Sequence, residues 1–372
     1  MYTRRAWKFV EAVATCLCIF LVSLQTSQAH ESSNTQGRPK VLMFAAINIS
    51  HLADSVQYWS EKAGVNGFFI DNIANWWTSR DKLFEKLQVL TEVNSRGARY
   101  GVDSNFLKVA LGYGKLPDWM DDEKWANVVK TFGDISELAN RSGSRGIAID
   151  TEAYSIPLLD TRDERYKGIR KDLLRAKVYQ RGRDIMRAIA DAFPDIEVIV
   201  LPEGAFYWFN PDQGTSPGSF ELWIDFWNGM ASVNNKNGIV IGAERTYSVL
   251  NSIHMGQIYA MGQKTMLEHV QNKAFWMNKC SIAIGMWPLG KSYEDKAARY
   301  TPVQFREQFQ AAVALSPRYV WIYGHGAAWW KLTAEEIKKH SSAGGVVWSP
   351  ESQMLPTDSA IDKFFAVVRE GR

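Results

Sequence analysis

Gly146-Ile147-Ala148-Ile149-Asp150-Thr151-Glu152 is a short apolar run that ends in two acids. The run is β-branched and has no polar residue before Asp150, which is typical of a strand buried on both faces of a parallel sheet. Strand side chains alternate between the faces, so Asp150 and Glu152 are predicted to point to the same side. Two carboxylates placed in this way repel each other, and one of them tends to hold a proton at a raised pKa.

Further runs of the same kind are spaced along the chain, and helical patterns separate them. The predicted strands cover residues 40–48, 66–71, 106–112, 145–150, 196–201, 238–243, 281–286 and 318–324. The predicted helices cover residues 51–64, 79–97, 122–142, 166–193, 219–233, 256–278, 302–315 and 357–370. Asp121 and Asp122 supply an N-cap for the third helix, and Pro302 fits a first-turn position.

Eight strand–helix units predict an α/β fold, a (β/α)₈ TIM barrel formed as a single domain by residues 39–372. The alternative is an open doubly wound sheet. Its dinucleotide-binding version would need a Gly-x-Gly-x-x-Gly after the first strand, and the sequence has none there. No shorter repeat and no linker rich in Pro or Ser divides the chain.

The first 29 residues are predicted to be a signal peptide. Arg4, Arg5 and Lys8 precede an apolar run at 13–24, and small residues at 27 and 29 suit a cleavage site. Residues 30–38 form a polar leader that is predicted to be disordered. We therefore expect an exported protein, periplasmic or extracellular, with no stable membrane association after cleavage.

Composition excludes several classes of function. Cleavage at residue 29 would change the formal net charge from +3 to about +1, and no basic patch is interleaved with aromatic residues, so no nucleic-acid partner is expected. Only Cys280 remains in the mature chain, so no internal disulfide can form. The 15 tryptophans are an unusual number. Tryptophan serves as a platform for sugar rings and equally as core filler.

Active sites of (β/α)₈ barrels lie at the carboxyl ends of the strands, so the residues at those ends are the candidates. They combine acids with aromatic side chains, as a carbohydrate cleft requires. The candidate catalytic residues are Glu152, Asp150, Glu244 and Glu203. The candidate substrate-binding residues are Asp71, Trp77, Tyr154, Tyr247, Trp287, His325 and Trp329.

Each of these acids also has a structural interpretation. Asp71 could cap the following helix, Glu203 could pair with a loop arginine, and Glu244 could pair with Arg245. Asp150 and Glu152 could form an ion pair with a neighbouring strand. No His-Glu-x-x-His motif or Cys/His cluster exists, so no zinc site and no cofactor are predicted. An oxygen-ligand site made by Asp150, Glu152 and Glu244 remains an alternative.

The run 146–152 resembles the end of the Asp-x-Asp-x-Glu signature of family-18 chitinases and is similar to the strand-4 Asp-x-Glu of hyaluronidases. The resemblance implies that Glu152 protonates the leaving oxygen. It also implies that Asp150 orients the N-acetyl group of the substrate, whose carbonyl attacks the sugar carbon. Ala148 departs from the chitinase signature, which has a further Asp there.

A broader likeness covers most of the mature chain. Asp-x-Glu-x-Tyr at 150–154, Glu-x-x-Tyr at 244–247 and the run 319–323 before a Trp-Trp pair resemble a group of secreted bacterial barrels described as glycoside hydrolases. This likeness implies the barrel and the enzyme class, and it implies no particular substrate. The position of His325 is often acidic in that group, so this chain departs from the pattern there.

The sequence therefore predicts an exported glycoside hydrolase with a poly- or oligosaccharide substrate, and the resemblance to family-18 chitinases implies a substrate that contains N-acetylhexosamine. Glu152 is the expected general acid. The second carboxylate is left open between Asp150, acting through a substrate acetamido group, and Glu244 or Glu203, acting as nucleophile or base. One alternative is a retaining hydrolase with Asp150 as nucleophile and Glu203 as acid. Another is a non-catalytic polysaccharide-binding barrel.

Overall fold

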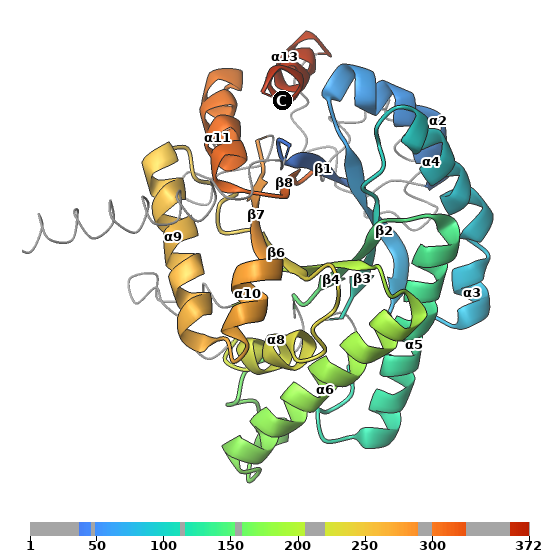
Figure 1. Cartoon of the computed structure of the whole chain (residues 1–372), viewed down its shortest axis with the longest axis vertical. Coiled ribbons are helices and arrows are strands. Elements are labelled where there is room, and N and C mark those ends of the chain that lie inside the picture. Colours follow the sequence, from blue (N-terminus) through green and yellow to red (C-terminus); the bar gives the residue numbers. More distant parts are fainter. Residues whose placement is uncertain are drawn as a thin grey trace, which may run out of the picture. The chain divides into compact units, whose positions relative to one another are not determined.

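Eight parallel strands pair in the order of the sequence, and the last strand pairs with the first, so the sheet closes into a barrel (Figure 1). This computed structural model describes residues 37–45, 49–111, 116–152, 158–204, 220–288, 300–324 and 358–371. The predicted (β/α)₈ barrel is confirmed, and the closed sheet excludes the open doubly wound alternative. Residues 1–36, which contain the predicted signal peptide and most of the predicted leader, lie outside the described residues.

The strands form at all of the predicted places, and helices surround them (Figure 1). The strands are β1 (Lys40–Ala45), β2 (Gly67–Asn75), β3 (Phe106–Ala110), β4 (Gly146–Asp150), β5 (Glu197–Leu201), β6 (Ile239–Ala243), β7 (Ser281–Met286) and β8 (Tyr319–Ile322). The helical elements are α2 (Ile49–Tyr58), η1 (Trp59–Ala63), α3 (Arg80–Phe84), α4 (Leu87–Arg99), α5 (Asp122–Ser142), η2 (Glu164–Tyr166), α6 (Lys171–Ala192), α8 (Trp223–Ala231), α9 (Ser252–His269), α10 (Lys273–Lys279), α11 (Pro302–Leu315) and α13 (Asp358–Glu370).

The helix caps follow the sequence where the capping residue is explicit. The side chain of Asp121 accepts a hydrogen bond from the N–H of Lys124, and Pro302 lies in the first turn of α11, both as predicted. The prediction of a single helix at 256–278 is wrong, because two helices occupy this part of the chain. The chain leaves helical conformation at Val270, and Asn272 caps a new helix by accepting from the N–H of Phe275 at 3.0 Å.

Two other predicted helices differ in the same way. The helix predicted at 79–97 is divided into α3 and α4 at residues 85–86, where Nζ of Lys86 turns inward to the carbonyl oxygen of Ile73. The helix predicted from residue 166 begins at Lys171, because residues 164–166 form a separate 3₁₀ turn. Apolar spacing continues across these breaks, so a pattern of period 3.6 does not reveal them.

The core has two compartments, which the alternation of strand side chains separates. One lies between the sheet and the helices. The other fills the inside of the barrel and consists of Leu42, Phe44, Phe69, Phe106, Ala148, Ile199, Leu201, Val240, Tyr247, Ala283, Tyr319 and Trp321. At Gly146 a Cβ atom would lie 1.8 Å from the carbonyl oxygen of Glu197, so only glycine lets β4 and β5 approach there.

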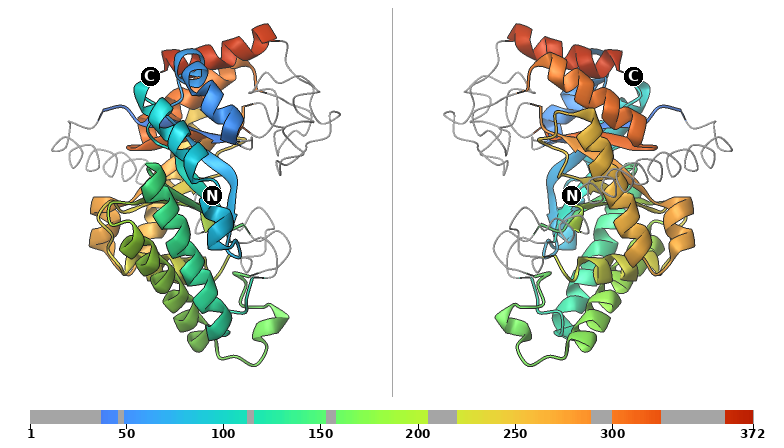
Figure 2. Two further views of the ribbon diagram at one scale, coloured as in Figure 1. Left: turned by 90° about the vertical axis from the view of Figure 1, so that its right-hand side faces the viewer. Right: turned by 90° about the vertical axis from the view of Figure 1, so that its left-hand side faces the viewer.

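Several tryptophans belong to the outer compartment. Trp119 and Trp125 stack with their ring centroids 4.7 Å apart, and both are fully buried. Arg181 of α6 covers this stack and donates to the carbonyl oxygen of Trp119 at 2.9 and 3.0 Å. Trp125 lies in α5 and Arg181 in α6, and these two helices run side by side (Figure 2). For these tryptophans the interpretation as core filler applies.

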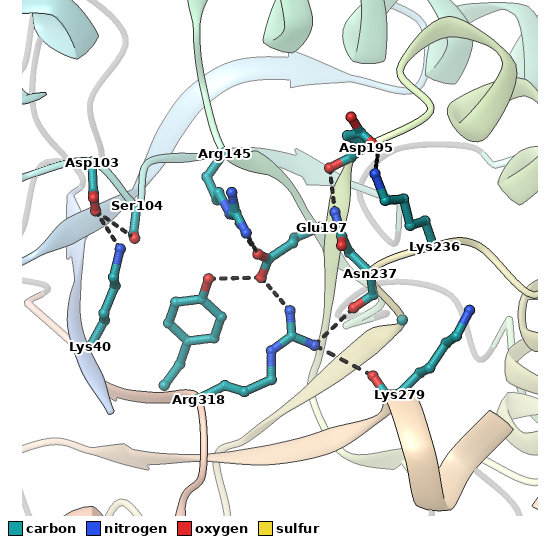
Figure 3. Close-up of polar contacts among 12 residues, drawn as sticks. Lys40, Asp103, Ser104, Arg145, Asp195, Glu197, Lys236, Asn237, Lys279 and Arg318 are labelled. Carbon is teal, nitrogen blue, oxygen red and sulfur yellow. Dashed lines mark hydrogen bonds and ion pairs between the residues drawn. The ribbon is translucent and has the colours of Figure 1, made fainter. Parts of the chain in front are cut away.

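Ionic groups close the barrel at the amino ends of the strands (Figure 3). Glu197 begins β5 and is buried, and its carboxylate accepts from Nε of Arg145 and from Arg318, each at 2.5 Å. The hydroxyl of Tyr319, inside the barrel, donates to the same carboxylate at 2.7 Å. Arg318 also donates to the carbonyl oxygen of Asn237 at 2.9 Å. One buried carboxylate therefore joins the starts of β4, β5 and β8.

The C-terminal helix completes the ring of helices between α11 and α2 (Figure 1). Glu370 of α13 forms an ion pair of 2.9 Å with Arg306 of α11. On the other side, Arg369 donates to the carbonyl oxygen of Lys62 in η1 at 3.2 Å. Phe365 contacts Trp59 with the ring centroids 5.8 Å apart. No helix among the described residues is long and apolar enough to span a membrane.

Removing the charge of Glu197 should destabilise the barrel, because Arg145 and Arg318 would lose their shared buried partner. We expect Glu197→Gln to lower the free energy of unfolding by about 2–3 kcal/mol, measured by urea denaturation at pH 7. Glu164→Gln is the control, because the Lys167–Glu164 pair is exposed and its atoms are 3.7 Å apart. That substitution should change stability by less than ~0.5 kcal/mol. Equal effects of the two substitutions would contradict a stabilising role of the Glu197 network.

Candidate active site

Acids from four strands meet at the carboxyl end of the barrel. Asp150 ends β4, and Glu152 follows it by two residues. Asp71 lies in β2, while Glu203 and Glu244 follow β5 and β6. Asp150 has the same parity as Ala148, which lies inside the barrel, so its side chain also faces the interior. The structure thus brings together all five acids that the sequence places at this rim.

A lysine lies between two of these acids. Nζ of Lys108, in β3, is 3.1 Å from Oδ1 of Asp71 and 2.9 Å from Oδ2 of Asp150. All three side chains are largely buried. The ring of Phe44 lies beside the ammonium group, with Nζ 5.3 Å from its centroid. Asp71 therefore pairs with β3 instead of capping the following helix, and β2 continues past it to Asn75.

Both carboxylate oxygens of Asp150 have partners. Oδ2 pairs with Lys108, and Oδ1 accepts a hydrogen bond from the N–H of Glu152 at 3.0 Å. The structural interpretation, an ion pair with a neighbouring strand, thus describes a contact that Asp150 makes. The side chain of Glu152 does not join that pair.

Glu203 contacts the main chain after β6. It is fully buried, and its oxygens accept from the N–H groups of Glu244 and Arg245 at 2.5 and 2.6 Å. Burial raises the pKa of Glu203, while these main-chain hydrogen bonds lower it, and the net direction is upward. The geometry makes Glu203 a tie between the ends of β5 and β6.

Glu152 and Glu244 differ from the other three acids. Within the described residues, neither carboxyl group accepts a hydrogen bond or forms an ion pair. Burial raises the pKa of Glu152 to about 8, the negative charge of Asp150 adds to this shift, and the positive charge of Lys108 opposes it. Burial also raises the pKa of Glu244 well above its usual value, with further contributions from the charges of Glu152, Glu203 and Asp150. One proton shared by such a pair is the expected state near neutral pH.

Aromatic side chains form one wall beside these acids. The ring of Tyr247, after β6, lies 5.9 Å from that of Trp287 and 5.4 Å from that of Tyr323. The hydroxyl of Tyr247 is buried and has no hydrogen-bond partner in the part of the chain that the structure describes. Burial raises the pKa of Tyr247 well above its usual value, and the charge of Glu244 adds to this, so the phenol stays protonated. The hydroxyl is therefore available as a donor.

The remaining predicted binding residues are placed less fully. Trp77 follows β2, and 50% of its surface is exposed, with its ring 5.1 Å from that of Trp76. Tyr154, His325 and Trp329 lie outside the described residues. Their assignment to the substrate site stays a prediction.

Lys108 was not among the predicted site residues, because the candidates were residues at or after strand ends and Lys108 lies within its strand. Tyr323 follows β8 and belongs to the strand-end residues, but it was not predicted to bind substrate. A lysine in the otherwise apolar run Phe106–Ala110 is nevertheless a usable signal. Alternation places it on the same face as Phe106, inside the barrel, where a charge needs a partner.

No group of three metal-ligating side chains occurs among the described residues. The predicted alternative of an oxygen-ligand site used Asp150, and in this structure the cation beside Asp150 is the ammonium group of Lys108. A divalent ion at that carboxylate would face the positive charge of Lys108. The geometry therefore does not favour that alternative.

No model of a protein family matches the chain, and no match was found among curated proteins. Several solved structures are similar. A GH18 chitinase from Pseudoalteromonas aurantia is 11% identical, with 76% of this chain and 93% of that chain covered and a TM-score of 0.41. An O-GlcNAc hydrolase mutant from Thermobaculum terrenum is 12% identical, with 77% and 54% covered and a TM-score of 0.43. A 3-keto-D-glucoside 4-epimerase from E. coli is 16% identical, with 78% and 95% covered and a TM-score of 0.44. All three TM-scores are below 0.5, so these similarities decide neither the fold nor the function of this chain.

Two tyrosines inside the barrel should respond oppositely to loss of their hydroxyl groups. Tyr247 and Tyr319 are each 5% exposed, but only Tyr319 has a hydrogen-bond partner for its hydroxyl among the described residues. We expect Tyr247→Phe to raise the free energy of unfolding by about 1 kcal/mol, and Tyr319→Phe to lower it by about 1–2 kcal/mol. Thermal denaturation of both variants beside the wild type measures this. A loss of stability in Tyr247→Phe would show that its hydroxyl is bonded within the protein.

Proposed function

We propose that this chain is an exported glycoside hydrolase that cleaves a poly- or oligosaccharide with Glu152 as general acid. One observation carries the proposal: among the described acids at the rim, Glu152 and Glu244 combine unpartnered carboxyl groups with raised pKa values. Asp71 and Asp150 both pair with Lys108, and Glu203 is bound to main-chain amides. Perturbed groups of this kind, left without structural partners, are candidates for proton transfer.

Glu152 suits the donation of a proton. With a pKa of about 8, its carboxyl group remains protonated at neutral pH. It can therefore transfer a proton to the glycosidic oxygen as the bond to the sugar carbon breaks, and the leaving sugar departs as a neutral alcohol. The fixed charge of Asp150 then stands beside the positive charge that develops on the sugar ring.

Glu244 is the better supported second carboxylate. When the proton that the two acids share is on Glu152, Glu244 is ionised. Its carboxylate can then act as nucleophile or as base toward a water. The alternative with Asp150 as nucleophile and Glu203 as acid has less support, because both oxygens of each residue already have partners. The route in which Asp150 orients an N-acetyl group that attacks the sugar carbon is the alternative that the resemblance to family-18 chitinases implies, and it would need an N-acetylhexosamine substrate but no nucleophilic Glu244.

The aromatic wall supports a sugar ligand. Tyr247, Trp287 and Tyr323 contact one another edge-on or tilted, and such rings offer flat apolar faces to pyranose rings. A non-catalytic polysaccharide-binding barrel would need these rings and would have no use for a pair of acids at raised pKa.

Glu152→Gln should abolish turnover and leave binding intact, because the amide keeps the shape of the side chain but carries no transferable proton. We expect a fall in kcat of about 10²–10⁴-fold with little change in affinity, measured on polysaccharides and aryl glycosides that include N-acetylhexosamine substrates. The kcat of Glu244→Gln should fall by a similar factor. Glu137→Gln, in α5 on the outside of the barrel, is the control and should turn over normally. Binding without turnover by the wild type on every substrate would leave the polysaccharide-binding barrel as the function.

The pH profile should show the protonation state of Glu152. A general acid acts only while protonated, so kcat/KM should fall as the pH rises through about 8. The residual activity of Glu152→Gln should show no such decline. Activity that rises through pH 8 would instead assign Glu152 the role of a base.

A further inference from the structure

Lys108 is a buried cation that contacts two of the rim acids, and the proposed mechanism gives it no task. We propose that Lys108 is a positioning residue: it bridges Asp71 and Asp150, fixes the carboxylate of Asp150 beside Glu152, and thereby couples the charge of Asp71 to the general acid. This inference rests on the proposed role of Glu152.

The bridge is tight and shielded from water. Its two N–O distances are 3.1 and 2.9 Å, and the side chains of Lys108, Asp71 and Asp150 are 8%, 13% and 7% exposed. Charges at such distances interact more strongly here than at the surface, because little solvent screens them. The interactions with both aspartates raise the pKa of Lys108 above its usual value despite its burial, so the lysine remains charged.

The bridge also fixes the orientation of Asp150. One of its oxygens is held by β3 through Lys108, and the other by the N–H of Glu152. Rotation of the carboxylate would break at least one of these contacts. Without Lys108, the carboxylate of Asp150 would keep only its contact with the N–H of Glu152. The lysine therefore holds the negative charge of Asp150 at a constant distance from the Glu152 side chain.

Charged and titratable groups approach Glu152 from several strands. Asp150 from β4 and Glu203 from β5 raise its pKa, and Lys108 from β3 lowers it. Glu244 from β6 and Tyr323 after β8 also lie close enough that the charge of Glu152 raises their pKa values. Among these described groups Lys108 is the cation that acts on Glu152. Removing a charge from its bridge should therefore shift the pKa of Glu152 in a predictable direction.

Two substitutions in the bridge should therefore shift the pH profile in opposite directions. Lys108→Met removes the positive charge, and the alkaline decline of kcat/KM should move to higher pH by about one unit. Asp71→Asn removes one of the two negative charges that offset Lys108, and the decline should move to lower pH. Lys108→Arg keeps the charge and should retain the wild-type profile. A residue that served the fold alone would give a decline at the same pH in every variant that folds.

The titration of Glu152 itself keeps this test separate from the proposed function. In proteins with isotope-labelled glutamate, the carboxyl resonance assigned by Glu152→Gln reports its pKa directly, whether or not a substrate is known. Shifts of opposite sign in Lys108→Met and Asp71→Asn would support the bridge, and identical titrations would overturn it. If Lys108→Met does not fold, Asp71→Asn against Lys108→Arg decides the matter: a downward shift in the first alone supports the proposal, and no difference refutes it. Absence of turnover by the wild type would refute only the glycosidase.

Discussion

Charge inside a closed barrel cannot be hydrated by bulk water, so it must be compensated by groups that the strands themselves supply. Both ends of this barrel meet that requirement. At the amino ends, two arginines and a tyrosine surround the carboxylate of Glu197. At the carboxyl ends, the signs are reversed, and two aspartates surround the ammonium group of Lys108. Apolar and aromatic side chains fill the interior between them.

The two ends of the barrel differ in whether every buried acid has a partner. At the amino ends the charge of Glu197 is matched by more than one cation, which suits a part of the barrel that only has to remain closed. At the carboxyl ends Glu152 and Glu244 have no such partner among the described residues, and the protein holds a proton there instead. Leaving two acids unpaired costs stability, and this cost is typical of sites that perform chemistry.

Much of this arrangement could be predicted from the sequence, because the strands are short, β-branched and separated by long helical patterns. The parity of Asp150 and Glu152 places their carboxyl groups together without any knowledge of the neighbouring strands. The partners of Glu203 could not be predicted in this way, since they are main-chain N–H groups that have no sequence signature. The ion pair of Lys108 was missed for a different reason: its partners lie in β2 and β4, and only the register of three strands brings them together. The break before Asn272 was missed because apolar spacing runs on through it.

The position of α13 has a consequence for how the chain is made. Among the described elements, β8, which pairs with β1, and α13, which packs between η1 and α11, come last in the sequence. During translation, β1 and β7 are therefore open edges that neither pair with each other nor have their final cover. Open edges of parallel sheets can recruit strands from other chains. The barrel of the nascent chain therefore cannot close until β8 has been synthesised and can pair with β1.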